Sequence, residues 1–386
     1  MKALVTGATG FIGKNLQVRL SELGCSVLTF NRNSDEASLE PLIGQADIIY
    51  HLAGVNRPLN EVDFGTVNVG LTDKICGICR KLTKKPIIVY ASSTQAENRS
   101  SYGESKRGGE KLLGEYQRDT GSAVFVYRLP NVFGKWSRPN YNSVVATFCH
   151  NISQGKTIEL HQKDAPLNLV YIDDVIDSFI DILKHSEPGL HWSTIHPVYQ
   201  VTVGALAEKI IAFKDTESTL TVQNVGRGLE RALYATYLSF LKPSQFSFPL
   251  NGHQDSRGNF CEILKTLESG QFSFFTALPG VTRGNHYHHT KNEKFLVLQG
   301  EARFRFRNIV SNETAELFVS ASPSQIVRTV PGWAHDITNV GDKELIVALW
   351  ANEVFDRERP DTIPFGVEYG KSIKSTNRSG NSPRAY

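Results

Sequence analysis

The 386-residue sequence predicts a doubly wound parallel α/β sheet followed by an all-β barrel. In the first half, short apolar runs at 2–6, 26–30, 48–53, 87–93 and 123–129 alternate with helical patterns, which is typical of such a sheet. From Phe246 onward the helical periodicity stops and short alternating strands follow. We therefore predict a first domain at 1–243, with a smaller lobe at about 135–240, and a second domain at 244–370. The polar tail at 371–386 is expected to be disordered.

Composition excludes several classes of function. The chain has 42 Lys+Arg against 39 Asp+Glu, and a net charge of +3 argues against a nucleic-acid partner. We expect no membrane insertion, because no apolar run is long enough to span a bilayer. Five scattered cysteines and a start without a signal-peptide pattern indicate a cytoplasmic protein. Cys76 and Cys79 are expected to pack in the core rather than to bind zinc.

A glycine-rich turn follows the first strand and opens a helix that runs to about Leu23. Such a turn lets the backbone approach a pyrophosphate, whose charge is stabilised by the helix N-terminus. The second strand ends in Asn31 and Arg32, where an NAD site would offer a carboxylate to the ribose; an amide and a guanidinium suit a 2′-phosphate, which favours NADPH. Alternatively, Arg32 is only a solvated loop charge. The cofactor contacts expected from the turn are Gly7, Thr9, Gly10, Phe11, Ile12 and Gly13.

Three further strands end at the same edge of the predicted sheet. The carboxyl ends of parallel strands are where open α/β sheets bind ligands, so these residues are expected to line the cofactor as well. They are Leu52, Ala53 and Gly54 after one strand, Ser92 at the end of the next, and Leu129 at the end of the fifth.

Tyr102 and Lys106 are four residues apart in a helical pattern, which puts both side chains on one face of a helix. The ammonium can lower the pKa of the phenol from about 10, so that the phenol exchanges a proton near neutral pH. That chemistry suits reduction of a ketone. The spacing alone also fits a solvated helix face, and only its neighbours favour the catalytic interpretation.

The first 240 or so residues resemble an extended short-chain dehydrogenase/reductase of the nucleotide-sugar group, which has a Rossmann-type sheet. The resemblance implies that Tyr102 donates or accepts the proton, that Lys106 binds the nicotinamide ribose, and that Ser93 or Thr94 contacts the reacting oxygen. It also implies that Asn131 contacts the sugar or its phosphate. The matching segments are Thr6-Gly-Ala-Thr-Gly-Phe-Ile-Gly13, His51-Leu-Ala-Gly54, Ser92-Ser93-Thr94, Tyr102-x-x-x-Lys106, Arg128-Leu-Pro-Asn-Val-Phe-Gly134 and Val170-Tyr-Ile-Asp-Asp-Val175.

One departure from that family narrows the reaction. Its dehydratases carry an Asp-Glu pair after the active hydroxyl, and this chain has Gln95-Ala96 instead, which argues against elimination of water. Its C4 epimerases recycle a tightly held NAD, which the Asn31-Arg32 sequence does not favour. Net reduction of a 4-keto sugar by NADPH fits best.

In the second half, four residues have the spacing of a metal site. His286 and His288 project to one face of a strand, and Glu293 and His335 can reach them from neighbouring strands. Three imidazoles and a carboxylate suit one divalent metal, with zinc first among Zn, Fe, Mn and Ni. This half resembles a cupin; its second motif is shortened, since Pro331 and Gly332 are adjacent, so His335 is the less certain ligand.

A second resemblance concerns the same residues. Segments around Arg257 and Arg283 resemble cupin-type epimerases of nucleotide 4-keto-6-deoxy sugars, in which an arginine pair binds the diphosphate and a histidine at the position of His286 is the base. A histidine that is bound to a metal cannot also be a free base. We favour metal binding and leave the epimerase base unassigned. A metal could polarise the ketone or only stabilise the barrel.

The order of the two halves resembles the bifunctional 3-epimerase/4-reductase enzymes of capsule and O-antigen synthesis. The resemblance implies a substrate, UDP-2-acetamido-2,6-dideoxy-β-L-arabino-hexos-4-ulose, that is inverted at C3 by the cupin and reduced at C4 to UDP-N-acetyl-L-6-deoxytalosamine, on the route to UDP-N-acetyl-L-fucosamine. It also implies a homodimer. One alternative is a dTDP- or UDP-hexulose reductase whose cupin half is only structural or ligand-binding. A cofactor-sensing regulator is disfavoured, because Tyr102 and Lys106 are intact.

Overall fold

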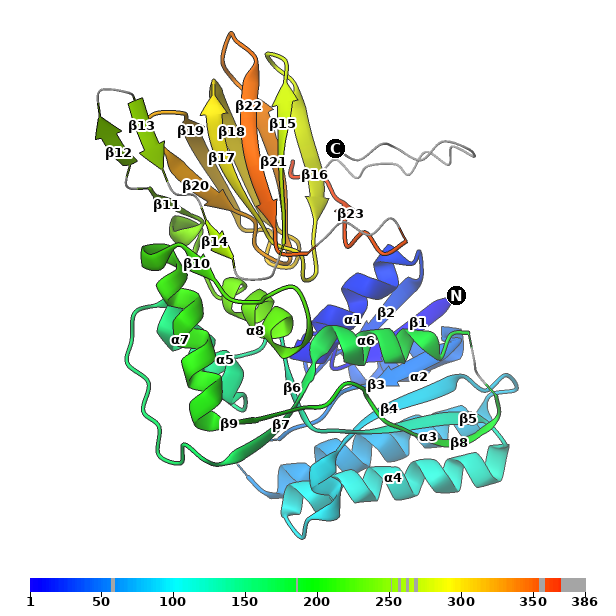
Figure 1. Ribbon diagram of the computed structural model, residues 1–386. Coiled ribbons are helices and arrows are strands. Elements are labelled where there is room, and N and C mark those ends of the chain that lie inside the picture. Colours follow the sequence, from blue (N-terminus) through cyan, green and yellow to red (C-terminus); the bar gives the residue numbers. More distant parts are fainter. Residues whose placement is uncertain are drawn as a thin grey trace. The chain divides into compact units, whose positions relative to one another are not determined.

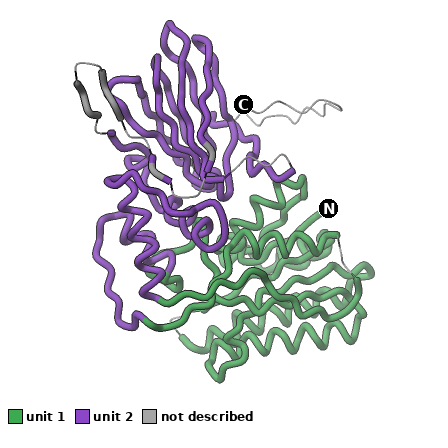
Figure 2. Tube along the Cα trace, in the orientation of Figure 1, with its two compact units in different colours: residues 1–144, 164–202 green, residues 145–163, 203–386 purple. Residues whose placement is uncertain are grey.

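The computed structural model describes all residues except 57–59, 185–186, 251, 256–257, 262–263, 267–269, 354–357 and 369–386. Two compact units are present: one contains residues 1–144 and 164–202, the other 145–163 and 203–386 (Figure 2). Residues 203–243 thus share a unit with the barrel, and the domain boundary near 244 stays a prediction. The predicted tail and Arg257 lie outside the described residues.

The first unit is built on a six-stranded parallel sheet with the strand order β2-β1-β3-β4-β5-β8 (Figure 1). A second sheet has the order β6-β7-β9. The elements are β1 (Lys2–Thr6), α1 (Phe11–Glu22), β2 (Ser26–Phe30), α2 (Leu39–Gln45), β3 (Ile48–His51), α3 (Gly70–Lys81), β4 (Ile87–Ser93), α4 (Ser101–Thr120), β5 (Ala123–Leu129), β6 (Asn131–Phe133), β7 (Pro166–Tyr171), α6 (Ile172–Asp181), β8 (Gly189–Ser193) and β9 (Tyr199–Thr202).

The predicted α/β fold is confirmed. Four of the five predicted strands have the predicted bounds, and the strand expected at 48–53 is shorter, because β3 ends at His51. Since β1 lies between β2 and β3, the strand order reverses at β1 and β3. Open sheets bind ligands outside the carboxyl ends of strands at such a reversal. The fold thus brings the glycine-rich turn after β1 beside residues 52–54 after β3.

One face of this sheet packs against α2, α3 and α4. The strands contribute an apolar layer that includes Leu4, Ile49 and Ile88. Cys76 and Cys79 of α3 belong to the same core, and burial raises the pKa of each thiol to about 12. Their expected role in core packing is confirmed. No helix in the described part of the chain is both long enough and apolar enough to span a membrane.

The second unit combines helices with two five-stranded antiparallel sheets, of orders β11-β20-β17-β22-β15 and β19-β18-β21-β16-β23. Its helices are α5 (Val144–Ser153), α7 (Val203–Thr219) and α8 (Gly228–Leu238). Its strands are β10 (Thr221–Val222), β11 (Ser247–Pro249), β12 (Gly252–Asp255), β13 (Gly258–Cys261), β14 (Lys265–Thr266), β15 (Gln271–Ala277), β16 (Thr282–Tyr287), β17 (Glu293–Gln299), β18 (Glu301–Asn308), β19 (Thr314–Ser320), β20 (Gln325–Arg328), β21 (Trp333–Asn339), β22 (Leu345–Ala351) and β23 (Ile363–Pro364).

Alternation of apolar and polar residues fixes which face of each strand is buried. In β18, Ala302, Phe304 and Phe306 are buried, whereas the arginines between them point outward. Phe246, at the start of the barrel, packs edge-to-face on Phe306 and Trp333, with ring centroids 5.3 and 4.9 Å away. These contacts close the barrel around an aromatic core.

The outer face of the sheet that contains β17 and β20 packs against α7 and α8. Arg328 of β20, only 5% exposed, pairs with Glu217 of α7 at 3.1 Å. Lys294 of β17 is hydrogen bonded to Tyr234 of α8 at 3.1 Å. Burial and the charge of Arg328 lower the pKa of Lys294 to about 7, and Glu217 opposes this shift. The carboxylate of Glu217 therefore stabilises two buried basic groups, those of Arg328 and Lys294.

We expect Glu217→Gln to destabilise the second unit by about 1–3 kcal/mol. Breaking a buried ion pair costs about 3–5 kcal/mol, and the partial exposure of Glu217 reduces this value. Glu208→Gln is the matched control, because Glu208 is an exposed residue of the same helix. Chemical unfolding followed by circular dichroism measures both variants. Equal stabilities of the two variants would contradict the expected role of Glu217.

Candidate functional site

The glycine-rich turn is tied to the ends of β2 and β3. Gly7 adopts a φ of +68°, and a Cβ atom there would lie 2.8 Å from the backbone nitrogen of Ala53, so only glycine fits. The N–H of Gly7 donates to the carbonyl of Phe30 at 2.8 Å. The N–H of Thr9 donates to the Oδ1 atom of Asn31 at 3.0 Å. The ends of β1, β2 and β3 are thus held together at one edge of the sheet.

Asn31 has a structural role in addition to the predicted cofactor role. Its Oδ1 atom already accepts a hydrogen bond from Thr9, and its own N–H donates to Ser34 Oγ at 2.9 Å. The side-chain amide is a remaining donor group of the residue. Arg32, which follows it, is exposed. Both residues therefore lie at the carboxyl end of β2, where the sequence placed them.

A hydrogen-bonded chain through a buried histidine supports residues 52–54. Thr72 donates to the carbonyl of Asn68 at 2.7 Å, so its hydroxyl can accept a bond from His51 Nε2 at 2.9 Å. His51 Nδ1 then accepts from the Thr6 hydroxyl at 2.8 Å, and Thr6 accepts from the N–H of Ala53 at 3.2 Å. Burial lowers the pKa of His51 to about 3, so the ring stays neutral. Sequence reasoning did not predict this role of His51.

Ser93 and Tyr102 meet where β4 ends and α4 begins. The Ser93 hydroxyl is near enough to the phenol of Tyr102 to lower its pKa. Ser93 is 9% exposed, whereas Thr94 points to solvent, so Ser93 is the one placed beside the phenol. Ser100 caps α4 by accepting from the N–H of Gly103 at 3.1 Å, and this cap fixes where the helix starts.

The expected direction of the pKa shift of Tyr102 was wrong. Burial raises the pKa of the phenol, and the neighbouring Ser93 hydroxyl lowers it only in part. Lys106 does not reverse the shift, since its own ammonium is buried and donates to the carbonyl of Ala91 at 2.8 Å. Burial lowers the pKa of Lys106 to about 8, against the opposing effect of Glu110. The ground-state phenol is therefore protonated at neutral pH, the form that donates a proton.

Lys106 also lies beside the predicted cofactor loop. A Cβ atom at Gly54 would be 3.3 Å from the ammonium and 3.1 Å from Asn68 Oδ1. Asn68 in turn accepts from the N–H of Val55 at 2.8 Å and donates to Ser105 at 2.9 Å. Because these groups crowd Gly54, the loop after β3 and the helix α4 are held in close contact.

Glu110 is a further residue of this site that sequence reasoning missed. It lies four residues after Lys106 on α4 and is buried. Its carboxylate accepts from Ser92 at 2.6 Å and from two nitrogens of Arg128 at 2.9 and 2.8 Å. The i, i+4 spacing from Lys106 was the available signal. Ser92, whose predicted contact with the cofactor stays a prediction, donates its hydroxyl proton to Glu110.

The predicted substrate residues lie in both units. Asn131 begins β6 with an exposed side chain, close in the chain to Leu129, a predicted cofactor residue that ends β5 and is buried. In the barrel, Arg283 of β16 donates to the carbonyl of Thr276 at 2.8 Å and lies over the ring of Phe275. Arg257, the second arginine of the predicted diphosphate pair, lies outside the described residues.

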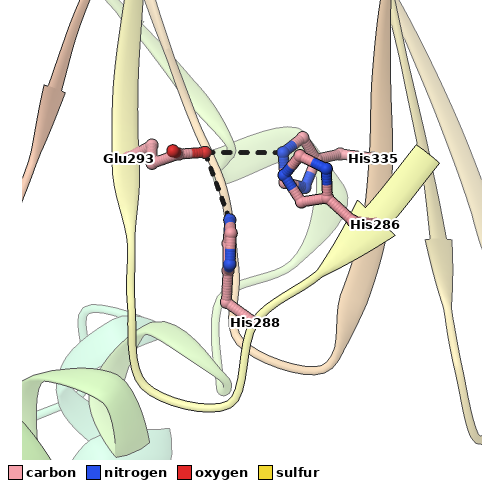
Figure 3. A group of neighbouring side chains, drawn as sticks. All are labelled: His286, His288, Glu293 and His335. Atoms are coloured by element: carbon pink, nitrogen blue, oxygen red, sulfur yellow. Dashed lines mark hydrogen bonds and ion pairs between the residues drawn. The ribbon is translucent and has the colours of Figure 1, made fainter. Parts of the chain in front are cut away.

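The four predicted metal ligands converge inside the barrel (Figure 3). One donor atom from each of His286, His288, Glu293 and His335 lies within 4.8 Å of the others. Glu293 Oε2 is 3.2 Å from His288 Nε2 and 3.5 Å from His335 Nε2. His335, the less certain ligand in the sequence, is as close to the cluster as the others.

A β-bulge in β16 aims His286 at this cluster. The register with β21 shifts between Gly284 and His286, and the extra residue, Asn285, has a φ of +60°. A Cβ atom at Gly284 would lie 2.8 Å from the carbonyl oxygen of His335. Glycine and asparagine are the residues that tolerate these positions. The bulge therefore explains the Gly-Asn sequence before the histidine.

The protonation states of His286 and Glu293 suit a cation. Burial, with the neighbouring His335 and His288, lowers the pKa of His286 to about 2. Burial opposes ionisation of Glu293, but the two histidines it contacts hold its pKa well below the usual value. Neutral imidazoles and an ionised carboxylate are the forms that bind metals. The donor set fits one divalent ion, and these contacts do not identify the metal.

Comparisons with known proteins agree with this geometry. Residues 3–195 match the NAD dependent epimerase/dehydratase family, and residues 253–363 match the polysaccharide biosynthesis C-terminal domain. The chain is 51% identical to a UDP-2-acetamido-2,6-beta-L-arabino-hexul-4-ose reductase of Pseudomonas aeruginosa, over 96% of this chain and 100% of the relative. The crystal structure of the capsular polysaccharide assembling protein CapF from Staphylococcus aureus is 40% identical, with a TM-score of 0.66, over 95% of this chain and 100% of that one. A CapF structure with the inhibitor 3-isopropenyl-tropolone has 36% identity, the same coverage and a TM-score of 0.61.

We expect Gly54→Ala to weaken cofactor binding by about tenfold. The added methyl group would force Asn68 or Lys106 to move, and overpacking of this kind costs about 1–3 kcal/mol. Gly77→Ala is the matched control, since a Cβ atom at Gly77 in α3 meets nothing within 4 Å. It should leave cofactor binding unchanged and raise stability by about 0.5–1 kcal/mol. Cofactor titration followed by fluorescence measures both, and equal affinities would refute the expected crowding.

Proposed function

Because the chain belongs to the NAD dependent epimerase/dehydratase family, and within it to the group of UDP-2-acetamido-2,6-beta-L-arabino-hexul-4-ose reductases, we propose that it reduces the C4 ketone of a UDP-linked 4-keto-6-deoxy amino sugar. The enzyme is thus a nucleotide-sugar reductase that shares its family with nucleotide-sugar epimerases. The observation that carries the proposal is the position of Tyr102 beside Ser93, one helical turn from the buried Lys106 on α4.

The chain's own residues would act on the sugar ketone as follows. Tyr102, protonated at neutral pH, gives its proton to the oxygen as the C4 ketone becomes an alcohol. Ser93 holds that oxygen by a hydrogen bond. Lys106 would bind the nicotinamide ribose. A bound nicotinamide cofactor supplies the hydride.

We propose NADPH as the preferred cofactor. Asn31 and Arg32 directly follow β2, the strand whose end faces the adenosine ribose in this family. Arg32 is exposed and can pair with a 2′-phosphate, whereas an acidic residue would accept the 2′-hydroxyl of NAD. The residue types at positions 31 and 32 therefore support this proposal.

For the barrel we propose C3 epimerisation of the same substrate, with one divalent metal, zinc first, held by His286, His288, Glu293 and His335. A bound metal would polarise the ketone and stabilise the enolate that precedes inversion. Arg283 would contact the diphosphate. The product after reduction would be UDP-N-acetyl-L-6-deoxytalosamine, the precursor of UDP-N-acetyl-L-fucosamine for surface polysaccharides. We propose a homodimer, on the family resemblance alone.

The test is to incubate the full-length protein with NADPH and the UDP-4-keto-6-deoxy-HexNAc sugar in D2O and to locate deuterium in the product by NMR. We expect NADPH oxidation together with deuterium at C3. Reduction without deuterium at C3 would leave a reductase whose barrel is structural or ligand-binding. Absence of NADPH oxidation would refute the reductase proposal.

Tyr102→Phe should decrease NADPH oxidation by about 100-fold or more, because the proton donor is lost. It should leave deuterium exchange at C3 unchanged, since the proposed epimerase site lies in the other unit. Tyr116→Phe is the control, as Tyr116 lies on the same helix and is buried in the core. If Tyr102→Phe also abolished exchange, two separable sites would be excluded.

Arg32→Ala should raise KM for NADPH by about tenfold, the value of one charge-assisted hydrogen bond, and leave KM for NADH unchanged. Arg118→Ala serves as the control, because Arg118 is an exposed arginine at the end of α4. Steady-state kinetics with each cofactor measure the ratio. An equal change in both KM values would show that Arg32 does not read the 2′-phosphate.

A further inference from the structure

Asp361 organises the turn that follows the first two histidines of the barrel cluster. Its Oδ1 atom accepts from the N–H of His289 at 2.8 Å, and its Oδ2 atom accepts from the N–H groups of Thr290 and Lys291 at 2.8 and 2.7 Å. The hydroxyl of Thr290 adds a fourth bond at 3.1 Å. A single carboxylate thus satisfies three consecutive backbone donors of one turn.

The backbone of the same residue holds a metal-ligand histidine directly. The carbonyl oxygen of Asp361 accepts a hydrogen bond from His288 Nδ1 at 2.6 Å. Because Nδ1 then carries the proton, the lone pair lies on Nε2, the atom that is 3.2 Å from Glu293 in the donor cluster. The tautomer and the direction of the ring are therefore both set by one contact.

Asp361 adopts a strained conformation to make these contacts. Its φ is +32°, in the left-handed region that side chains rarely occupy and that aspartate tolerates better than most. Such strain persists only when surrounding contacts determine the conformation. The next residue, Thr362, adds one more contact, because its Oγ1 atom accepts a hydrogen bond from Lys291 Nζ at 2.9 Å. The chain at 361–362 is thus fastened to the turn at 288–291 by side chains and backbone together.

We infer that Asp361 is a positioning residue for a divalent cation: its carboxylate shapes the 288–291 turn and its carbonyl presents His288 Nε2 to the donor cluster. Partners that orient a metal-ligating histidine in this way typically change metal affinity by about 10–100-fold when they are lost. The inference rests on the proposed metal site. It adds a determinant of that site that is 73 residues from His288 in the sequence.

The experiment compares full-length wild type with Asp361→Gly and Asp361→Asn. Glycine accepts the positive φ and keeps the carbonyl, so this variant removes only the carboxylate. Asparagine keeps the shape but loses one acceptor oxygen, which leaves backbone donors of the turn unsatisfied. Asp342→Asn is the control, because Asp342 is exposed in the turn between β21 and β22. The metal-free proteins are titrated with Co²⁺, followed by its visible absorption, and with Zn²⁺ against a chromophoric chelator.

We expect one ion per chain in wild type, about 10–100-fold weaker binding and an altered Co²⁺ spectrum in both Asp361 variants, and wild-type behaviour in Asp342→Asn. Wild-type affinity and spectrum in either Asp361 variant would overturn the role of Asp361 and leave the metal site standing. Absence of binding by wild type would instead refute the proposed metal site, and the inference with it. Circular dichroism verifies folding, and either folded variant suffices for the test.

Discussion

The burial of a charged lysine constrains the whole site of the first unit. A charge inside a protein is tolerated when it is paired or hydrogen bonded. The ammonium of Lys106 bonds a carbonyl of β4, and Glu110, one turn further along α4, opposes the loss of its charge. Glu110 is itself held by Ser92 of β4 and by Arg128 of β5. The groups that accommodate the lysine therefore also fix the end of β4 against the start of α4, where the reacting oxygen would bind.

Strand β17 imposes a comparable constraint on the second unit. Glu293 points into the barrel toward the histidines, and the next residue, Lys294, points out toward Tyr234 of α8. Because successive residues of a strand alternate between faces, one register of β17 sets both the donor cluster and the packing of the helices. A shift by one residue would put the ammonium of Lys294 among the histidines and remove the carboxylate of Glu293 from the cluster. The register of β17, rather than any single contact, therefore keeps the donor cluster together.

The residues that could be predicted from the sequence are those that lie close together in the chain at a spacing typical of their chemistry. Tyr102 and Lys106 share a helix face, and three of the four barrel donors lie within eight residues of each other, so both groups were recognisable. Asp361 was not, because its contacts arise only when the chain returns to the turn after β16. The pKa of Tyr102 also required the structure, since its direction depends on how deeply the phenol is buried. Local pattern predicts which groups react, whereas their tuning depends on tertiary contacts.

The proposed reactions explain why two sites on one chain need no switch between them. The hydrogen at C3 is acidic only while C4 is a ketone, because the ketone stabilises the enolate; inversion must therefore precede reduction. Epimerisation is reversible and leaves a mixture of two ketones. Reduction of one of them removes the acidity of C3 and consumes a cofactor, so the mixture is drawn toward the epimer that the reductase accepts. Direction then comes from the selectivity of the site around Tyr102 and Ser93, and the barrel only has to exchange the C3 proton faster than that site reduces the ketone.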